Sequence, residues 1–193
     1  MISAFALLLH LNPLGETKLI LRLSQKLSTK IKAGTLATLP LEENPFADWS
    51  AHLFQADRTQ YILLSNTKSL YSTLMYGKGI TNDSRFIERA MSNLREALED
   101  DGQAFIYQRF IAPAGGSVRF AKALNRAVTG SMNDLIVHAT ALLTEGGLSP
   151  FEVGFRLNDV LLSAIAASKA EKYGKPREAF KRLGELDPTA PGE

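Results

Sequence analysis

Three residues that hydrolytic enzymes use lie close together in the second half of the chain. Ser131, Asp134 and His138 stand at offsets of three and seven, which places them along one face of a helix. A serine nucleophile needs the histidine at its hydroxyl and the acid on the far side of the ring. Successive turns of one helix do not readily give that order. We therefore predict that Ser131 caps a helix, with Asp134 in the first turn and His138 as its i,i+4 partner, and we keep Ser131, Asn133, Asp134 and His138 as candidate binding residues.

Polar and aromatic side chains also gather around the strand-rich middle of the chain. An aromatic sheet face beside Arg or Lys can stack nucleic-acid bases. Aromatic residues on strands are, however, more commonly core or cross-strand partners. The candidate binding residues of this second group are Trp49, His52, Arg58, Asn66, Ser69 and Arg119.

Composition excludes several kinds of site. The chain has no cysteine, which excludes disulfides, iron–sulfur clusters, cysteine zinc ligands and a cysteine nucleophile. Its three histidines show no HxH or HxxxH spacing, so we predict no metal site. The glycine-containing segments 77–79 and 115–117 fit turns better than phosphate-binding loops. We therefore predict no cofactor, and we assign no catalytic residue.

The elements that must position these residues follow from hydrophobic periodicity. Short turns join three successive strand patterns, and the continuous apolar run at 61–64 predicts a central strand covered on both faces. Because strands come first and helices follow, we predict an α+β fold, an antiparallel meander with helices packed mainly on one face. The predicted strands lie near residues 19–23, 49–55, 60–65, 70–76 and 117–121, and the predicted helices near 25–31, 84–100, 103–111, 132–143, 150–158, 160–172 and 176–183.

A length of 193 residues predicts one domain, which we place at residues 19–187. Residues 1–18 form an N-terminal extension or follow a misassigned start, and residues 188–193 form a tail. The apolar run at 2–11 is too short to cross a bilayer and lacks a basic region before it. We therefore expect a cytoplasmic protein without a membrane association.

Charge is balanced overall but uneven along the chain. The net charge is +2, yet residues 18–32 and 102–133 each carry several Lys or Arg and no acid. Solvated faces are one explanation. If folding joins the two segments, a basic face results, and our leading hypothesis is a non-enzymatic binding or regulatory module for nucleic acid or another anionic partner. The alternative is an unfamiliar enzyme, acting on phosphodiesters, that would bring His52, Arg58, Arg119, Asp134 and His138 into one cleft.

The chain also resembles a family of uncharacterised bacterial proteins, a domain of unknown function. The resemblance covers residues 19–183 and implies no activity, because none is established for the family. It rests on the segments Glu43-Asn44-Pro45 with Asp48-Trp49, Asp57-Arg58-Thr59-Gln60-Tyr61, Asn66-Thr67-Lys68-Ser69-Leu70-Tyr71-Ser72, and Gly130-Ser131-Met132-Asn133-Asp134-Leu135.

Overall fold

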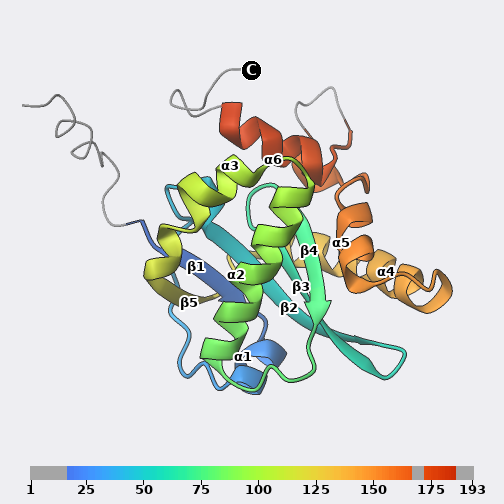
Figure 1. Ribbon diagram of the computed structural model, residues 1–193, viewed down its shortest axis with the longest axis horizontal. Coiled ribbons are helices and arrows are strands. Elements are labelled where there is room, and N and C mark those ends of the chain that lie inside the picture. The colour runs from blue at the N-terminus through green and yellow to red at the C-terminus, as the bar shows by residue number, and fades with distance from the viewer. Residues whose placement is uncertain (1–16, 167–171, 186–193) are drawn as a thin grey trace, which may run out of the picture.

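A computed structural model describes residues 17–166 and 172–185. Its five-stranded sheet has the order β4-β3-β2-β1-β5 (Figure 1). β2, β3 and β4 form the predicted antiparallel meander, but β1 pairs in parallel with both β2 and β5. The strands are β1 (Leu19–Leu23), β2 (Asp48–Ala56), β3 (Thr59–Asn66), β4 (Ser72–Tyr76) and β5 (Val118–Lys122).

The α+β class is confirmed, whereas a wholly antiparallel sheet is wrong. Residues 24–47 lie between β1 and β2 and carry the chain back to the end of the sheet where β1 began, which makes the pair parallel. β4 starts later than predicted because Leu70 has a φ of 60° and belongs to the preceding turn. The hairpin between β2 and β3 turns at Asp57 and Arg58, whose positive φ angles of 40° and 60° match the twist of the flanking strands.

Most of the predicted helices begin at the capping residues that the sequence contains. Ser24 caps the first helix, and Ser149 and Glu152 make a reciprocal capping box at the fifth. The α-helices are α1 (Gln25–Ile31), α2 (Asp83–Asp100), α3 (Ala104–Ile106), α4 (Arg126–Glu145), α5 (Pro150–Leu157) and α6 (Pro176–Glu185); a π-helical turn follows at Tyr107–Ile111, and 3-10 turns lie at Pro45–Ala47, Ala114–Gly116 and Ser163–Ile165.

Two helix predictions are wrong. α4 begins six residues before the predicted start, because the side chain of Asn125 accepts a hydrogen bond from the backbone N–H of Val128 at 2.9 Å and caps it there. Ser131 therefore lies inside the helix. The predicted helix at 160–172 is replaced, over its described part, by a 3-10 turn and by Leu162, which pairs with Gly174 in an antiparallel bridge; residues 167–171 lie outside the described residues.

Helices cover both faces of the sheet, which corrects the prediction of one covered face. One apolar cluster joins the first face of the sheet, including Trp49 and Ile62, to α1, α2 and Phe180 of α6. A second cluster joins the opposite face, including Leu63, to α4 and α5. Since Ile62 and Leu63 alternate along β3, each face of this strand contributes apolar side chains to its own core.

A buried ion pair holds a connecting segment over the second face of β1. The guanidinium of Arg22 donates to both carboxylate oxygens of Asp48 at 2.8 and 2.7 Å, and both side chains are 1% exposed. Arg22 also donates to the carbonyls of Leu39 and Pro40, and the backbone N–H of Glu42 donates to Asp48. Because every charged atom has a partner, the pair meets the condition that burial of ions imposes. This pair fixes residues 39–42 beside the sheet.

Candidate functional site

Three of the ten predicted site residues have structural roles. Trp49 is fully buried in the first core, and its indole N–H donates to the Phe46 carbonyl at 2.7 Å. The side-chain oxygen of Asn66 accepts hydrogen bonds from the backbone and hydroxyl of Ser69 at 3.0 and 2.9 Å. The amide of Asn66 donates to the Pro45 carbonyl at 2.8 Å. Asn66 and Ser69 thus shape the turn between β3 and β4 and tie it to the segment before β2.

Four predicted residues lie on α4 but do not converge. Ser131 is 8% exposed and belongs to the buried side of the helix. Asn133, Asp134 and His138 are exposed. Because the hydroxyl of Ser131 turns inward and the other groups face outward, this segment does not assemble a nucleophile with its base.

The remaining three residues come from separate parts of the sheet. Arg58 is exposed at the tip of the β2–β3 hairpin. Arg119 is exposed on β5, an edge strand that β1 separates from β2. His52 is half-buried on β2, and its pKa is lowered first by burial and then by the charge of Lys26. Within residues 17–166 and 172–185, no group of three His, Asp or Glu side chains is placed to hold a metal ion.

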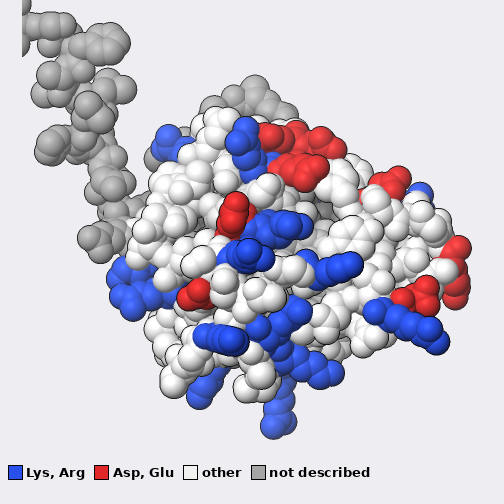
Figure 2. Space-filling view, turned by 60° about the horizontal axis from the view of Figure 1, so that its bottom comes forward, with Lys and Arg blue, Asp and Glu red and all other residues white. Residues whose placement is uncertain are grey.

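A concentration of positive charge lies at the end of the molecule where α1 meets the start of α2. Figure 2 shows a broad group of Lys and Arg side chains over this end, with few acids among them. All six of these side chains are exposed or half-exposed. We call this surface the basic face; it consists of Lys26, Lys30, Lys32, Lys78, Arg85 and Arg89.

Specific contacts join the two helices of the basic face through the start of β3. The ammonium of Lys30 on α1 donates to the Gln60 side chain at 2.8 Å. The carbonyl of Gln60 accepts the backbone N–H of Gly77 at 2.7 Å, beside Lys78. The guanidinium of Arg85 on α2 then reaches the Gly79 carbonyl at 3.4 Å. These contacts keep cations from three chain segments on one surface.

The cations of the basic face are not neutralised by neighbouring acids. The four ion pairs among the described residues involve Arg22, Arg95 and Arg177 only, so none uses a cation of this face. The nearest acids in sequence are Asp83 and Glu88 on α2. A surface with unpaired cations presents a positive field to an approaching anion.

The C-terminal end of α2 is acidic, against the preference of an isolated helix. The first turns carry Asp83 and Glu88 as well as Arg85 and Arg89, whereas the last turns carry Glu96, Glu99 and Asp100 with Arg95. A helix favours acids near its N-terminus and bases near its C-terminus, each by about 0.3–1 kcal/mol. The 18 residues of α2 span about 27 Å, so the acidic end lies well away from Arg85 and Arg89. Helix stability does not explain the excess of acids at the C-terminal end.

The sequence did not single out half of the basic face. Lys78, Arg85 and Arg89 are interleaved with Asp83 and Glu88 along the chain, so they form no acid-free run. The acid-free segments 18–32 and 102–133 lie side by side, because β1 pairs with β5 from Leu19–Val118 to Leu23–Lys122, but the basic face includes no residue of the second segment. A helical projection of α2 would have shown that Arg85 and Arg89 share one side.

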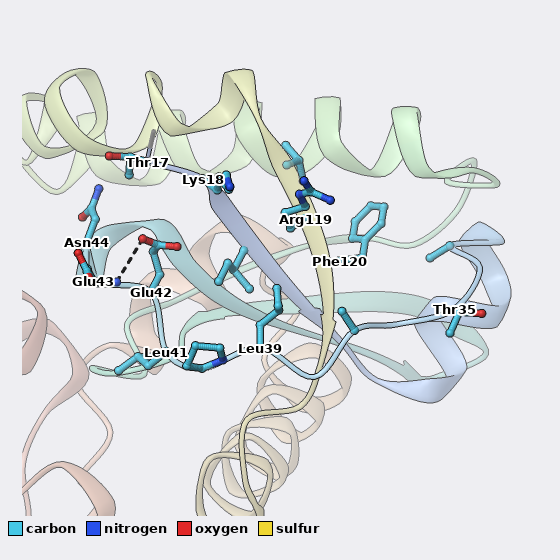
Figure 3. A pocket seen from close by; sticks show the side chains of 15 residues that line it. Thr17, Lys18, Thr35, Leu39, Leu41, Glu42, Glu43, Asn44, Arg119 and Phe120 are labelled. Atoms are coloured by element: carbon cyan, nitrogen blue, oxygen red, sulfur yellow. Dashed lines mark hydrogen bonds between the residues drawn. The ribbon is translucent and has the colours of Figure 1, made fainter. Parts of the chain in front are cut away.

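A separate cleft lies where β1 and β5 begin. It has a volume of about 1170 Å³, and its apolar lining includes Ile20, Leu39 and Phe120. Figure 3 shows Lys18 and Arg119 extending over one part of the cleft, with Glu42 and Glu43 at another. Arg119 is the predicted site residue that lines this cleft.

A buried polar cluster lies at the acidic end of α2. Arg177 of α6 forms ion pairs with Asp101 and Asp159, and its guanidinium stacks 4.3 Å from the Phe155 ring centroid. Burial, and then the charge of Asp101, raise the pKa of the Tyr71 hydroxyl. Tyr71 is therefore neutral beside Asp101, the C-cap of α2, and Asp101 is ion-paired with Arg177 of α6. These contacts hold α6 against the end of α2.

The structure defines a small α+β domain with a basic surface, and comparison gives its family. Residues 20–179 match the family described as "Domain of unknown function (DUF6933)", and the chain belongs to that family. No curated protein and no solved structure matches the chain. Over the described ranges, no helix combines the length and the apolar character that crossing a bilayer requires.

Proposed function

We propose that the domain is a non-enzymatic binding module whose basic face binds the phosphate backbone of nucleic acid. The observation that carries the proposal is the basic face itself, where six cations from three chain segments gather without carboxylate partners among the described residues. Phosphate contacts from Lys and Arg supply most of the affinity of sequence-independent binding. The charge distribution of α2 supports the proposal, since its excess of acids lies at the far end of the helix, away from Arg85 and Arg89, and so opposes the field of the basic face less.

An exposed aromatic ring favours single strands as the ligand. Tyr76 is 49% exposed and stands directly before the turn that carries Lys78. Its ring lies 5.4 Å from that of Tyr61, which in turn lies 5.8 Å from Phe54. These rings lie on the second face of the sheet, whereas α1 and α2 cover the first, so a strand bound at the basic face reaches Tyr76 by passing round the end of β4. An exposed ring supported from behind can stack an unpaired base, which contributes about 1–3 kcal/mol. The cysteine-free sequence fits a reducing compartment, and we infer the cytoplasm as the place of binding.

The proposal is tested by fluorescence anisotropy with short labelled single-stranded RNA, single-stranded DNA and duplex DNA over a series of salt concentrations. The logarithm of the binding constant should fall linearly with the logarithm of the salt concentration, with a slope near −0.7 for each phosphate neutralised on a single strand. Tyr76→Ala should weaken binding of single strands more than binding of the duplex.

Charge reversal at Arg85 separates binding from stability. Arg85→Glu should weaken binding and flatten the salt slope, yet it should raise the stability of α2, because it places an acid in the first turn. Lys181→Glu is the matched control, since Lys181 is exposed on α6, away from the basic face. Absence of binding at low salt, or equal losses from the two variants, would remove the proposal.

A further inference from the structure

The two edges of the sheet differ in whether other parts of the chain cover their backbone groups. At the β4 edge, the side-chain oxygen of Asn158 accepts the backbone N–H of Ser72 at 2.7 Å, and its amide donates to the Ser72 carbonyl at 2.9 Å. Gly154 of α5 approaches the same strand so closely that a Cβ there would lie 2.8 Å from the Leu74 nitrogen. An amide side chain and a helix thus cover this edge, as proteins commonly do to prevent unwanted strand pairing.

The β5 edge is open over its first half. The N–H of Leu19 donates to the Ser117 carbonyl at 2.9 Å, so the N–H of Val118, in the same peptide unit, points away from β1. Because a strand alternates, Phe120 and Lys122 present their backbone groups to the same free side. Lys122 uses this side already, since its N–H donates to the Ala37 carbonyl at 2.8 Å. For Val118 and Phe120, the part of the chain that the structure describes supplies no backbone partner on this side.

The partner of Lys122 indicates that this edge accepts a parallel strand. Ala37 and Ala121 form a parallel bridge, so residues around Ala37 already act as one position of a sixth strand. The cleft of about 1170 Å³ borders the unused positions Val118 and Phe120. Backbone groups without a partner therefore lie beside open space instead of packed side chains.

The charges of the cleft indicate which side chains an added strand should carry. Lys18, directly before β1, and Arg119, on the neighbouring strand β5, extend over the same part of the cleft (Figure 3). Neither takes part in the four ion pairs found within residues 17–166 and 172–185. On an added strand, every second side chain would lie on the side of the sheet that Arg119 faces. Acidic residues at those positions would meet both cations, whereas Glu42 and Glu43 lie at another part of the cleft.

We propose that the open edge of β5 binds an extended acidic peptide of another protein, which pairs with Val118 and Phe120 as a sixth strand. Main-chain hydrogen bonds provide the affinity in this kind of recognition, and alternate side chains provide the specificity. Acidic side chains contact Lys18 and Arg119, and the apolar floor at Ile20 takes up the rest of the cleft-facing surface. This surface is separate from the basic face, so the two proposals succeed or fail independently.

The test uses the full chain and a short fluorescein-labelled peptide in which Val alternates with Asp. Three comparison probes accompany it: a peptide that alternates Val with Lys, the Val–Asp peptide with alternate backbone nitrogens methylated, and the scrambled sequence. The Val–Asp peptide should bind in an anisotropy titration. Methylation should weaken binding of this peptide about tenfold or more, since it removes several main-chain hydrogen bonds.

Two variants locate the binding on β5. Val118→Pro removes one outward N–H at the first position of an edge strand, where proline is tolerated, and it should weaken the Val–Asp peptide. Arg119→Glu should transfer preference to the Val–Lys peptide. Arg126→Glu, an exposed change at the start of α4, should leave both affinities unchanged, and thermal melts check that each variant is folded.

Several outcomes would overturn the proposal. One is equal binding of the methylated and unmethylated peptides, which needs no variant and shows that charge alone attracts the probe. Others are no binding of the Val–Asp peptide, or a dimer that Val118→Pro dissociates, which would assign the edge to a second copy of the chain. Intramolecular crosslinks from the cleft to residues 1–16 would assign it to the chain's own first residues.

Discussion

Gly154 provides a sharp test of how α5 packs against the sheet. A Cβ on this residue would lie 2.8 Å from the backbone nitrogen of Leu74 and 3.1 Å from the Cα of Thr73. Both are backbone atoms of β4 and cannot rotate away. The variant Gly154→Ala must therefore displace α5 from the strand or distort the strand itself.

The magnitude follows from two opposing terms. Overpacking of a well-packed site costs about 1–3 kcal/mol, and Gly→Ala inside a helix returns at most about 1 kcal/mol. We expect a net loss of about 1–2 kcal/mol of unfolding free energy. Gly130→Ala is the matched control, because Gly130 lies inside α4 and a Cβ there meets nothing within 4 Å. The control should gain up to about 1 kcal/mol, so the same substitution has opposite signs at the two sites.

Urea denaturation followed by tryptophan fluorescence measures both variants. Trp49 is the only tryptophan in the chain and is fully buried in the first core, so its emission reports global unfolding. The midpoints of the two variants should move in opposite directions from that of the unchanged protein. Gly154→Ala as stable as Gly130→Ala would refute the close approach of α5 to β4.

Three further predictions concern stability. Asn158→Ala should cost about 2–4 kcal/mol in urea denaturation, because it leaves two buried backbone groups without partners; an unchanged midpoint would contradict the edge contact. Hydrogen bonds from the hydroxyl and backbone of Ser149 lower the pKa of Glu152. The ionised carboxylate therefore contributes fully to stability above its unfolded pKa, and this contribution is lost as pH falls through the folded pKa. In thermal melts from neutral to acid pH, Glu152→Gln should lack this part of the loss of stability. Burial first, and Lys26 second, lower the pKa of His52, so stability should fall as pH drops below its unfolded pKa of about 6.5, and His52→Gln should flatten that slope in the same melts.

Local signals predicted much of the fold. Ser149 and Glu152 correctly predicted the start of α5, and Ser24 predicted the start of α1. The turn residues between β2 and β3 predicted the hairpin. In each case the determining contacts lie within a few residues of one another. The continuous apolar run at 61–64 also predicted a strand covered on both faces, and the two cores confirm this.

The errors arose where distant segments decide the outcome. The parallel pairing of β1 depends on Arg22 and Asp48 meeting across 26 positions of sequence. The start of α4 was misplaced because Asn125 and Ser131 are both good caps, and the turn that Asn125 begins adds the contact of Val128 with the second core. Helices on both faces follow from where α4 and α5 dock, which periodicity within one segment does not encode.

The candidate site was harder to predict than the fold. Asn66 and Ser69 are polar residues near strands, as a binding site would require, but their hydrogen bonds stabilise a turn. The basic face depends instead on Lys30, Lys78 and Arg85, which belong to three segments that meet only in the folded chain. Charge on a surface is a property of the fold, so a linear search for acid-free runs recovers only part of it.

The most direct test of the basic face is a map of amide chemical shifts in the full chain as short single-stranded RNA is added at low salt. Binding as proposed should shift the signals of α1, of the turn at residues 77–79 and of the first turns of α2, and added salt should reverse the shifts. Signals around α6 should not move. Shifts centred on α6 or on the far end of α2, or no shifts at saturating RNA, would contradict the account.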